Sequence, residues 1–173
     1  MAAAEIALQL EELVLASDSR YMTGTIGKLS LVPNAVNVIP GKAVFSIDIR
    51  SVSMEDKEAL LEQLAKRIRE IEERRKVKIR VQMQNHDRPV LCDPHLMHIL
   101  QEECRKSAVP CMELVSGAYH DSLMLGDFTK VGMLFVPCKD GISHSEKEWA
   151  SCEDIAMGAD VLAKAMLRLG NEI

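Results

Sequence analysis

His144 is the residue whose position in this sequence most invites a chemical role. It follows the apolar run and proline of VGMLFVP, then the turn CKDGIS, and it stands between two serines. In α/β folds, ligands bind beyond the carboxyl ends of the strands, where such a turn lies. The imidazole is therefore a candidate metal ligand or acid–base group. The alternative is a loop histidine bonded to nearby backbone, and the local residues alone favour that alternative.

A second cluster, SGAYHDS at residues 116–122, carries Ser116, His120, Asp121 and Ser122. These are the residue types of a nucleophilic triad, but adjacent His and Asp side chains usually diverge, whereas the members of a triad must converge. A polar loop that binds substrate through backbone groups fits the pattern better. A turn that leads into a helix fits it equally well. We therefore predict no catalytic triad here.

Asn37 and Arg50 form a third candidate site. Asn37 interrupts the apolar run AVNVI, and Arg50 ends a strand-like segment whose other polar positions are Ser46 and Asp48. An amide and a guanidinium fork together can grip a carboxylate. The ordinary alternative is an asparagine in a turn and a strand-end arginine in water, and the residues by themselves favour it.

His95 and His98 stand three residues apart on a predicted helix, a spacing at which two imidazoles can share a metal ion. Asp93 is the one neighbouring residue placed to help complete a cage. We therefore interpret the pair as part of a solvated helix face.

The composition places these residues in an ordinary globular protein. The chain has 173 residues, of which 47% are hydrophobic, enough for a buried core. The net charge is −5 and basic residues alternate with acidic ones, which argues against nucleic acid or an anionic membrane as partner. No apolar run approaches the ~20 residues of a membrane helix, and no signal peptide is apparent. We expect a cytoplasmic protein whose five cysteines are reduced and mostly buried.

Hydrophobic periodicity predicts five regular elements in the first half of the chain. They are a helix at 2–16, strands at 23–32 and 42–50, a helix at 54–76 and a strand at 77–85. Alternation points Phe45, Ile47 and Ile49 to one face of the second strand. In the last strand the inward residues are Val77, Ile79, Val81 and Met83. The order is that of a ferredoxin-like βαββαβ unit that lacks its first strand.

The pattern of residues 87–173 predicts part of an α/β layer, about one half of it. Its elements are a helix at 94–106, a strand at 111–115, a short helix within 119–127, a buried strand at 131–136 and a helix at 153–169. Ser151 and Asp154 resemble a capping box for the last helix. The predicted buried stripe of that helix is Ile155, Ala159, Leu162, Met166 and Leu169. Half a sheet leaves an edge and a face uncovered.

Three stretches, taken in order, resemble a known family. They are GTIGKLSLVPNAVNVIPGKAVFSIDIRS, SGAYHDS and MLFVPCKDGISHSEKEWASCEDIAMGADVLAKAMLRL. Together they are similar to the hydantoinase/carbamoylase-type amidases, a branch that includes N-carbamoyl-L-amino acid amidohydrolase, allantoate amidohydrolase and beta-ureidopropionase. The branch belongs to the dinuclear-zinc aminoacylase/carboxypeptidase superfamily. The resemblance covers essentially the whole chain.

The resemblance implies an arrangement and a set of site residues. Residues 1–86 would be the lid, which also forms a homodimer, and residues 87–173 the C-terminal part of an α/β zinc-exopeptidase-like catalytic domain. His144 would match a metal ligand. Asn37 and Arg50 would match lid residues that hold the substrate carboxylate in the partner subunit's active site. The substrate-side loop would supply Ser116, Gly117, Ala118 and His120, with Tyr119 where the family usually has glycine.

The family chemistry uses two divalent ions, usually zinc and in some members manganese. The metal pair polarises the carbonyl oxygen of a ureido or amide group and activates a water, while a glutamate acts as general base. The remaining metal ligands and the general base of the family have no match here, and one imidazole cannot hold two ions. We therefore expect a C-terminal fragment without catalytic residues, inactive alone, which requires a separate N-terminal catalytic segment. The alternatives are an aminoacylase or dipeptidase of the same superfamily, or a noncatalytic dimerisation or binding remnant.

Overall fold

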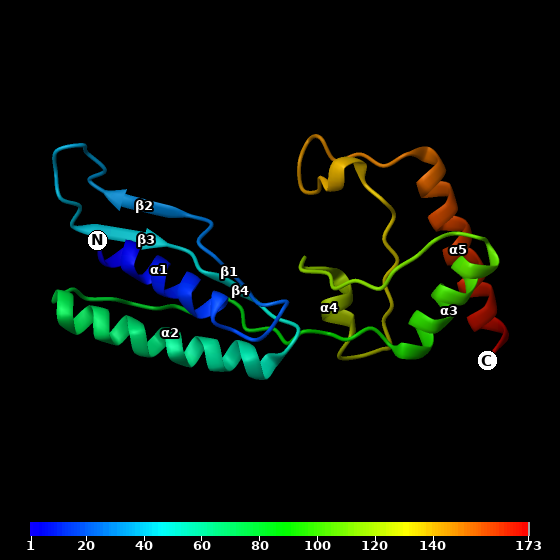
Figure 1. The fold of residues 1–173 in the computed structure, drawn as a ribbon, viewed down its shortest axis with the longest axis horizontal. Coiled ribbons are helices and arrows are strands. Elements are labelled where there is room, and N and C mark those ends of the chain that lie inside the picture. The colour runs from blue at the N-terminus through cyan, green and yellow to red at the C-terminus, as the bar shows by residue number, and fades with distance from the viewer. Residues whose placement is uncertain (173) are drawn as a thin grey trace. The chain divides into compact units, whose positions relative to one another are not determined.

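The computed structural model describes residues 1–172, which divide into two compact units. Unit 1 is Met1–Pro89, and unit 2 begins at Val90 (Figure 1). The predicted boundary after residue 86 lies just before this division. Within the described residues, no helix is both long enough and apolar enough to cross a membrane.

Two helices that pack side by side form the core of unit 1. They are α1 (Ala2–Leu15) and α2 (Met54–Arg75), close to the predicted ranges (Figure 1). Their buried residues are Ile6, Leu10, Leu13, Leu60, Leu64, Ile68 and Ile71. Helix α2 begins where the Ser53 hydroxyl accepts a hydrogen bond from the Asp56 backbone N–H at 3.1 Å, and it ends at Lys76 in the left-handed conformation.

A two-stranded antiparallel ladder with an interruption covers these helices. Strand β1 (Thr23–Thr25) pairs with β4 (Asp48–Arg50), and β2 (Leu29–Val32) pairs with β3 (Lys42–Phe45). Three residues, 26–28, connect β1 to β2, whereas two residues, 46–47, connect β3 to β4. The extra residue acts as a β-bulge and splits each predicted strand in two.

The predicted alternation of the second strand is confirmed. Phe45, Ile47 and Ile49 are partly buried against the helical core, while the residues between them are exposed. This pattern requires one face of the ladder to lie on the helices, and it leaves Asp48 and Arg50 on the solvent face.

The prediction of a strand at 77–85 is wrong, because these residues form no strand in the described part of the chain. Ile79 packs against the core, and its backbone N–H donates to Glu72 Oε1 at 2.8 Å. The other three residues predicted to face inward, Val77, Val81 and Met83, are exposed. No described strand pairs with this segment, and an extended segment without a ladder partner cannot satisfy its backbone groups as a strand does.

Unit 2 is built on two packed helices, α3 (Pro94–Lys106) and α5 (Cys152–Asn171). Helix α5 begins at the predicted cap, where the Ser151 hydroxyl accepts the Asp154 backbone N–H, and α3 begins at Asp93, whose carboxylate accepts backbone N–H groups of the first turn. A short helix, α4 (Asp121–Leu125), and the 3₁₀ turn η1 (Lys139–Gly141) complete the regular elements of the described residues.

Three predictions for unit 2 are wrong. The segments 111–115 and 131–136 form no described strand, for want of a ladder partner. The buried face of α5 carries Val161 and Ala165 rather than the predicted stripe, whose members Ile155, Leu162 and Met166 are exposed. Helix α5 has apolar residues on two faces, and the contact with α3 uses the face with the smaller side chains.

The cysteines also differ from expectation. Cys104 alone is buried, whereas Cys92 and Cys138 are partly buried and Cys111 and Cys152 are exposed. The prediction that they are mostly buried small apolar residues therefore holds only for Cys104.

Candidate substrate-binding site

Arg50 ends β4 on the solvent face, where it is held by Asp48. The two residues are two apart on one strand, so their side chains project from the same face. Arg50 Nε donates to Asp48 Oδ1 at 2.8 Å and Nη2 donates to Oδ2 at 2.9 Å. This hydrogen-bonded pair lowers the pKa of Asp48 and raises the pKa of Arg50. Both side chains are about half exposed, so the pair orients the guanidinium more than it stabilises the fold.

Asn37 lies in the turn between β2 and β3. Gly41 N–H donates to Val32 O at 3.0 Å and closes this turn, while Val36 and Ile39 beside Asn37 are almost fully exposed. Extended chain rises about 3.3 Å per residue, so the run from Lys42 to Arg50 covers roughly 26 Å. Asn37 and Arg50 therefore lie at opposite ends of the paired strands (Figure 1). Within one copy of the chain the two side chains do not meet at one carboxylate.

The SGAYHDS segment forms an ordered loop around a serine–histidine pair. Ser116 Oγ lies 2.8 Å from His120 Nε2, and the same hydroxyl accepts the Ala118 backbone N–H at 3.3 Å. The His120 ring packs against Phe135, with 5.5 Å between ring centroids. Among the described contacts the His120 ring bonds Ser116 rather than Asp121. The interpretation of this cluster as something other than a triad agrees with this geometry.

Gly117 lies between the two bonded residues of this loop and is exposed. A Cβ added at Gly117 would meet nothing within 4 Å. The Gly117 Cα is therefore not enclosed by neighbouring side chains.

His144 projects from an exposed loop that closes on itself. Lys139 N–H donates to Trp149 O at 2.8 Å, and His144 N–H donates to Glu148 Oε2 at 2.8 Å. His144 is exposed and has a positive φ of 55°. Glu148 is not among the site residues predicted from the sequence, although its position four residues after His144 is the available signal. This bond uses the backbone N–H of His144, and the residue as a whole is exposed.

An open hollow lies against the same loop. Its lining residues are Lys139, Asp140, Ile142, Lys147 and Trp149. Two lysines against one aspartate give the lining a net positive charge, and Trp149 adds a flat apolar surface.

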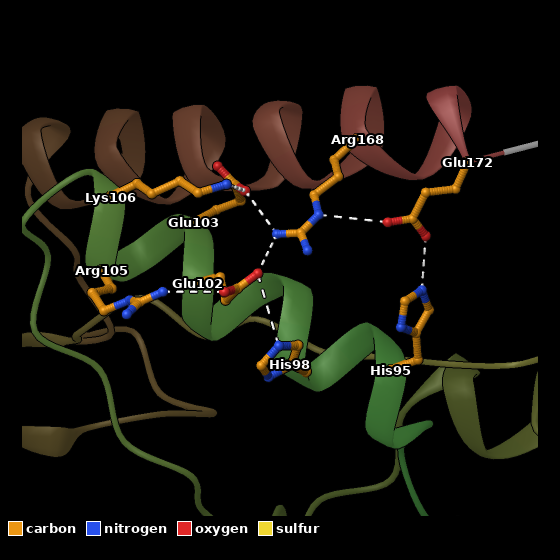
Figure 2. Close-up of polar contacts among 8 residues, drawn as sticks. All are labelled: His95, His98, Glu102, Glu103, Arg105, Lys106, Arg168 and Glu172. Atoms are coloured by element: carbon orange, nitrogen blue, oxygen red, sulfur yellow. Dashed lines mark hydrogen bonds and ion pairs between the residues drawn. The ribbon is translucent and has the colours of Figure 1, made fainter.

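The described residues do not fit a metal pair. No group of three or more His, Cys, Asp or Glu side chains within residues 1–172 is arranged to hold an ion. His95 and His98 face separate acids, since His95 Nε2 lies 2.8 Å from Glu172 Oε2 and His98 Nε2 lies 3.8 Å from Glu102 Oε2 (Figure 2). Asp93 caps α3 instead of facing them. The interpretation of this pair as a solvated helix face agrees with these contacts.

Figure 2 shows that these acids belong to an ion network between α3 and α5. Arg168 is at its centre, with Nη1 at 2.5 Å from Glu102 Oε2 and at 3.3 Å from Glu103 Oε1, and Nε at 3.5 Å from Glu172 Oε1. Lys106 Nζ also lies 2.7 Å from Glu103 Oε1. Hydrogen bonds to Arg168, Lys106 and His95 lower the pKa values of Glu102, Glu103 and Glu172 respectively. We assign this network a structural role.

The network predicts acid sensitivity of unit 2. A carboxyl group whose folded pKa lies below its unfolded value of about 4.5 contributes stability above that pH and loses it as the pH falls through the folded pKa. The Tm should therefore be level near neutrality and fall below about pH 4.5. Arg168→Met should lower the Tm at pH 7 and flatten this decline, as measured by circular dichroism. Lys164→Met, which removes an exposed pair on α5, is the matched control and should keep the decline. An equally steep acid decline in Arg168→Met would contradict the assignment.

The amino-acid sequence of this chain matches a family model and several known hydrolases. Residues 5–168 match the sequence model of peptidase family M20/M25/M40. The chain is 32% identical over 166 residues to an N-carbamoyl-L-amino-acid amidohydrolase of Pseudomonas sp. (strain NS671), and 38% identical over 170 residues to a ureidoglycolate hydrolase of Oryza sativa subsp. japonica. These alignments cover 96% and 98% of this chain, but 40% and 35% of the relatives.

A solved structure shows the same relation. The crystal structure of an amidase of the hydantoinase/carbamoylase family from Burkholderia multivorans matches with a TM-score of 0.88 at 30% identity. The match covers 96% of this chain and 40% of the amidase. The predicted α/β fold class and the predicted family resemblance are confirmed by these matches. The chain thus spans about two fifths of the length of such relatives.

Proposed function

Because this chain belongs to peptidase family M20/M25/M40 and its relatives are amidohydrolases, we propose that it forms part of a metal-dependent enzyme that cleaves a ureido C–N bond. The proposed substrates are N-carbamoyl-L-amino acids or allantoate, which carry a carboxylate beside the scissile group. The observation that carries the proposal is Arg50, an exposed guanidinium oriented by Asp48 at a strand end. A fork held in this way is suited to bind a substrate carboxylate.

Each site residue has a proposed part. Arg50 binds the substrate carboxylate, and the loop of Ser116, Gly117, Ala118 and His120 contacts the substrate. Asn37 belongs to a separate contact, because it lies at the other end of the strands. In a homodimer formed through unit 1, Arg50 would act on the site of the other copy. The exposed edges of the ladder and the charged face of α2 are the surfaces proposed for that contact.

The metal donors are proposed to come mainly from polypeptide outside residues 1–173. His144 would be one donor, since neutral imidazole suits zinc and its ring is exposed. The described residues include no group of three or more possible donors, and the chain covers about two fifths of its relatives. The absence of a donor cluster in the described residues also favours the second candidate, a noncatalytic dimerisation or binding module.

Metal content and complementation separate these two candidates. We expect the purified chain to retain less than one zinc per molecule after dialysis and to release no ammonia from N-carbamoyl amino acids. Mixing it with the remaining N-terminal part of the Pseudomonas relative should restore hydrolysis, and His144→Ala should abolish that gain. Complementation without any effect of His144→Ala would remove this residue from the site.

Three other results would change the assignment. Retention of two zinc ions with turnover by the chain alone would refute the requirement for an outside segment. Restored hydrolysis of N-acetyl but not N-carbamoyl amino acids would favour an aminoacylase. Failure of all complementation, with a stable dimer by light scattering, would favour the noncatalytic module.

A further inference from the structure

The chain reverses its direction at the end of α3. Ala108 takes a positive φ of 54°, its N–H donates to Arg105 O at 3.1 Å, and Val109 N–H donates to Cys104 O at 2.9 Å. These two bonds are those of a Schellman motif, which ends a helix by turning the chain back along it. Cys104, in the last turn of α3, is part of this motif.

The segment after the turn runs back beside α3. Gln101 Nε2 donates to Glu113 Oε1 at 2.5 Å, so residue 113 lies beside a residue one turn before Cys104. Cys111 falls between this contact and the Val109 bond to Cys104. Two independent contacts therefore bring Cys111 next to Cys104.

The two thiols interact directly and have unequal access to solvent. Burial of Cys104, and after it a side-chain hydrogen bond with Cys111, raise the pKa of the Cys104 thiol. Cys104 is 3% exposed, whereas Cys111 is exposed. Solvent access to one thiol and a second thiol beside it are two features of a redox-sensing cysteine with a resolving partner.

We propose that Cys104 and Cys111 are a redox modification site that forms an intramolecular disulfide on exposure to a hydroperoxide such as hydrogen peroxide. The Cys111 thiolate attacks the peroxide, the O–O bond breaks, and Cys111 becomes a sulfenic acid while water is released. The Cys104 sulfur then attacks the Cys111 sulfur, the S–O bond breaks, and the oxygen leaves as a second water with the proton that Cys104 gives up. Two thiols are oxidised and one peroxide is reduced.

The disulfide would fasten the segment 111–115 to the end of α3. This segment leads directly into the loop of Ser116 and His120, so the bond would restrict the start of that loop. The accessible position of Cys111 makes the bond reducible by dithiothreitol. This inference concerns the chain's own thiols and does not depend on the proposed hydrolytic activity.

Mass spectrometry of the full chain tests the proposal. After treatment with one equivalent of hydrogen peroxide, we expect the intact mass to fall by two hydrogen atoms and to return with dithiothreitol. Trypsin cuts after Arg105 and Lys106, so the disulfide should join two peptides, one ending at Arg105 and one containing Cys111. Because Cys92 shares the first of these peptides, the experiment is repeated with Cys92→Ser.

Two serine variants test whether Cys111 forms the disulfide. Cys111→Ser, an exposed substitution that leaves the core intact, should abolish the linked peptide, and Cys152→Ser should leave it unchanged. Three results would overturn the proposal. They are a link to a cysteine other than Cys104, oxidation of Cys111 to sulfinic acid without a link, and a covalent dimer in place of the internal disulfide.

Discussion

Replacing Arg50 with alanine is expected to raise the KM for an N-carbamoyl amino acid roughly 10- to 100-fold once the chain is combined with a segment that supplies the metal donors. The guanidinium would bind the carboxylate in ground state and transition state alike, so kcat should change less than KM. Zinc content should remain unchanged, because Arg50 donates hydrogen bonds and cannot ligate a metal. Steady-state kinetics with metal analysis of the same samples measures all three quantities.

Two controls sharpen the Arg50 experiment. Arg69→Ala removes an exposed arginine from α2 and should leave KM unchanged. Asp48→Asn keeps a side chain of the same size but weakens the two hydrogen bonds that orient the Arg50 guanidinium. The KM should therefore rise less than in Arg50→Ala. A KM in Arg50→Ala equal to that of Arg69→Ala would remove Arg50 from the substrate site.

Replacing Leu10 with alanine should cost unit 1 about 3 kcal/mol of its free energy of unfolding. Leu10 is 2% exposed and belongs to the core that α1 shares with α2. It is also close to β1, since a Cβ added at Gly24 would lie 3.0 Å from Leu10 Cδ1. The truncation removes buried methyl groups and leaves a cavity among rigid neighbours.

Urea denaturation followed by circular dichroism measures this loss as a lower midpoint at unchanged slope. Leu8→Ala is the matched control, because Leu8 lies on the same helix and is 62% exposed. It should change stability by less than about 0.5 kcal/mol. Equal losses in the two variants would show that the α1–α2 packing is not the core of unit 1.

The positions of the helices could be predicted from sequence because the information is local. Apolar residues at helical spacing predict α1, α2 and α3 nearly to the residue, and the caps at Ser151 and Asp93 lie within a few residues of the backbone groups they bind. The alternation around Phe45 and Ile49 is local as well. The resemblance to the amidases likewise depends on short stretches of sequence.

The strand predictions at 77–85, 111–115 and 131–136 failed because a strand is completed by another segment. Alternation shows that a segment is suited to a ladder, but only tertiary structure decides whether a partner lies beside it. The same reason explains α5, whose sequence carries apolar residues on two faces. Packing against α3 buries the face that carries Val161 and Ala165.

The candidate site divides in the same way. The sequence by itself determined which side chains are equipped for carboxylate and metal chemistry, namely Arg50, Asn37 and His144. Tertiary structure alone decided that Asn37 lies at the far end of the strands from Arg50 and that the segment of Cys111 runs back beside α3. The physical reason is that residue type is fixed by the chain, whereas distance between side chains depends on turns, bulges and pairing that distant segments share.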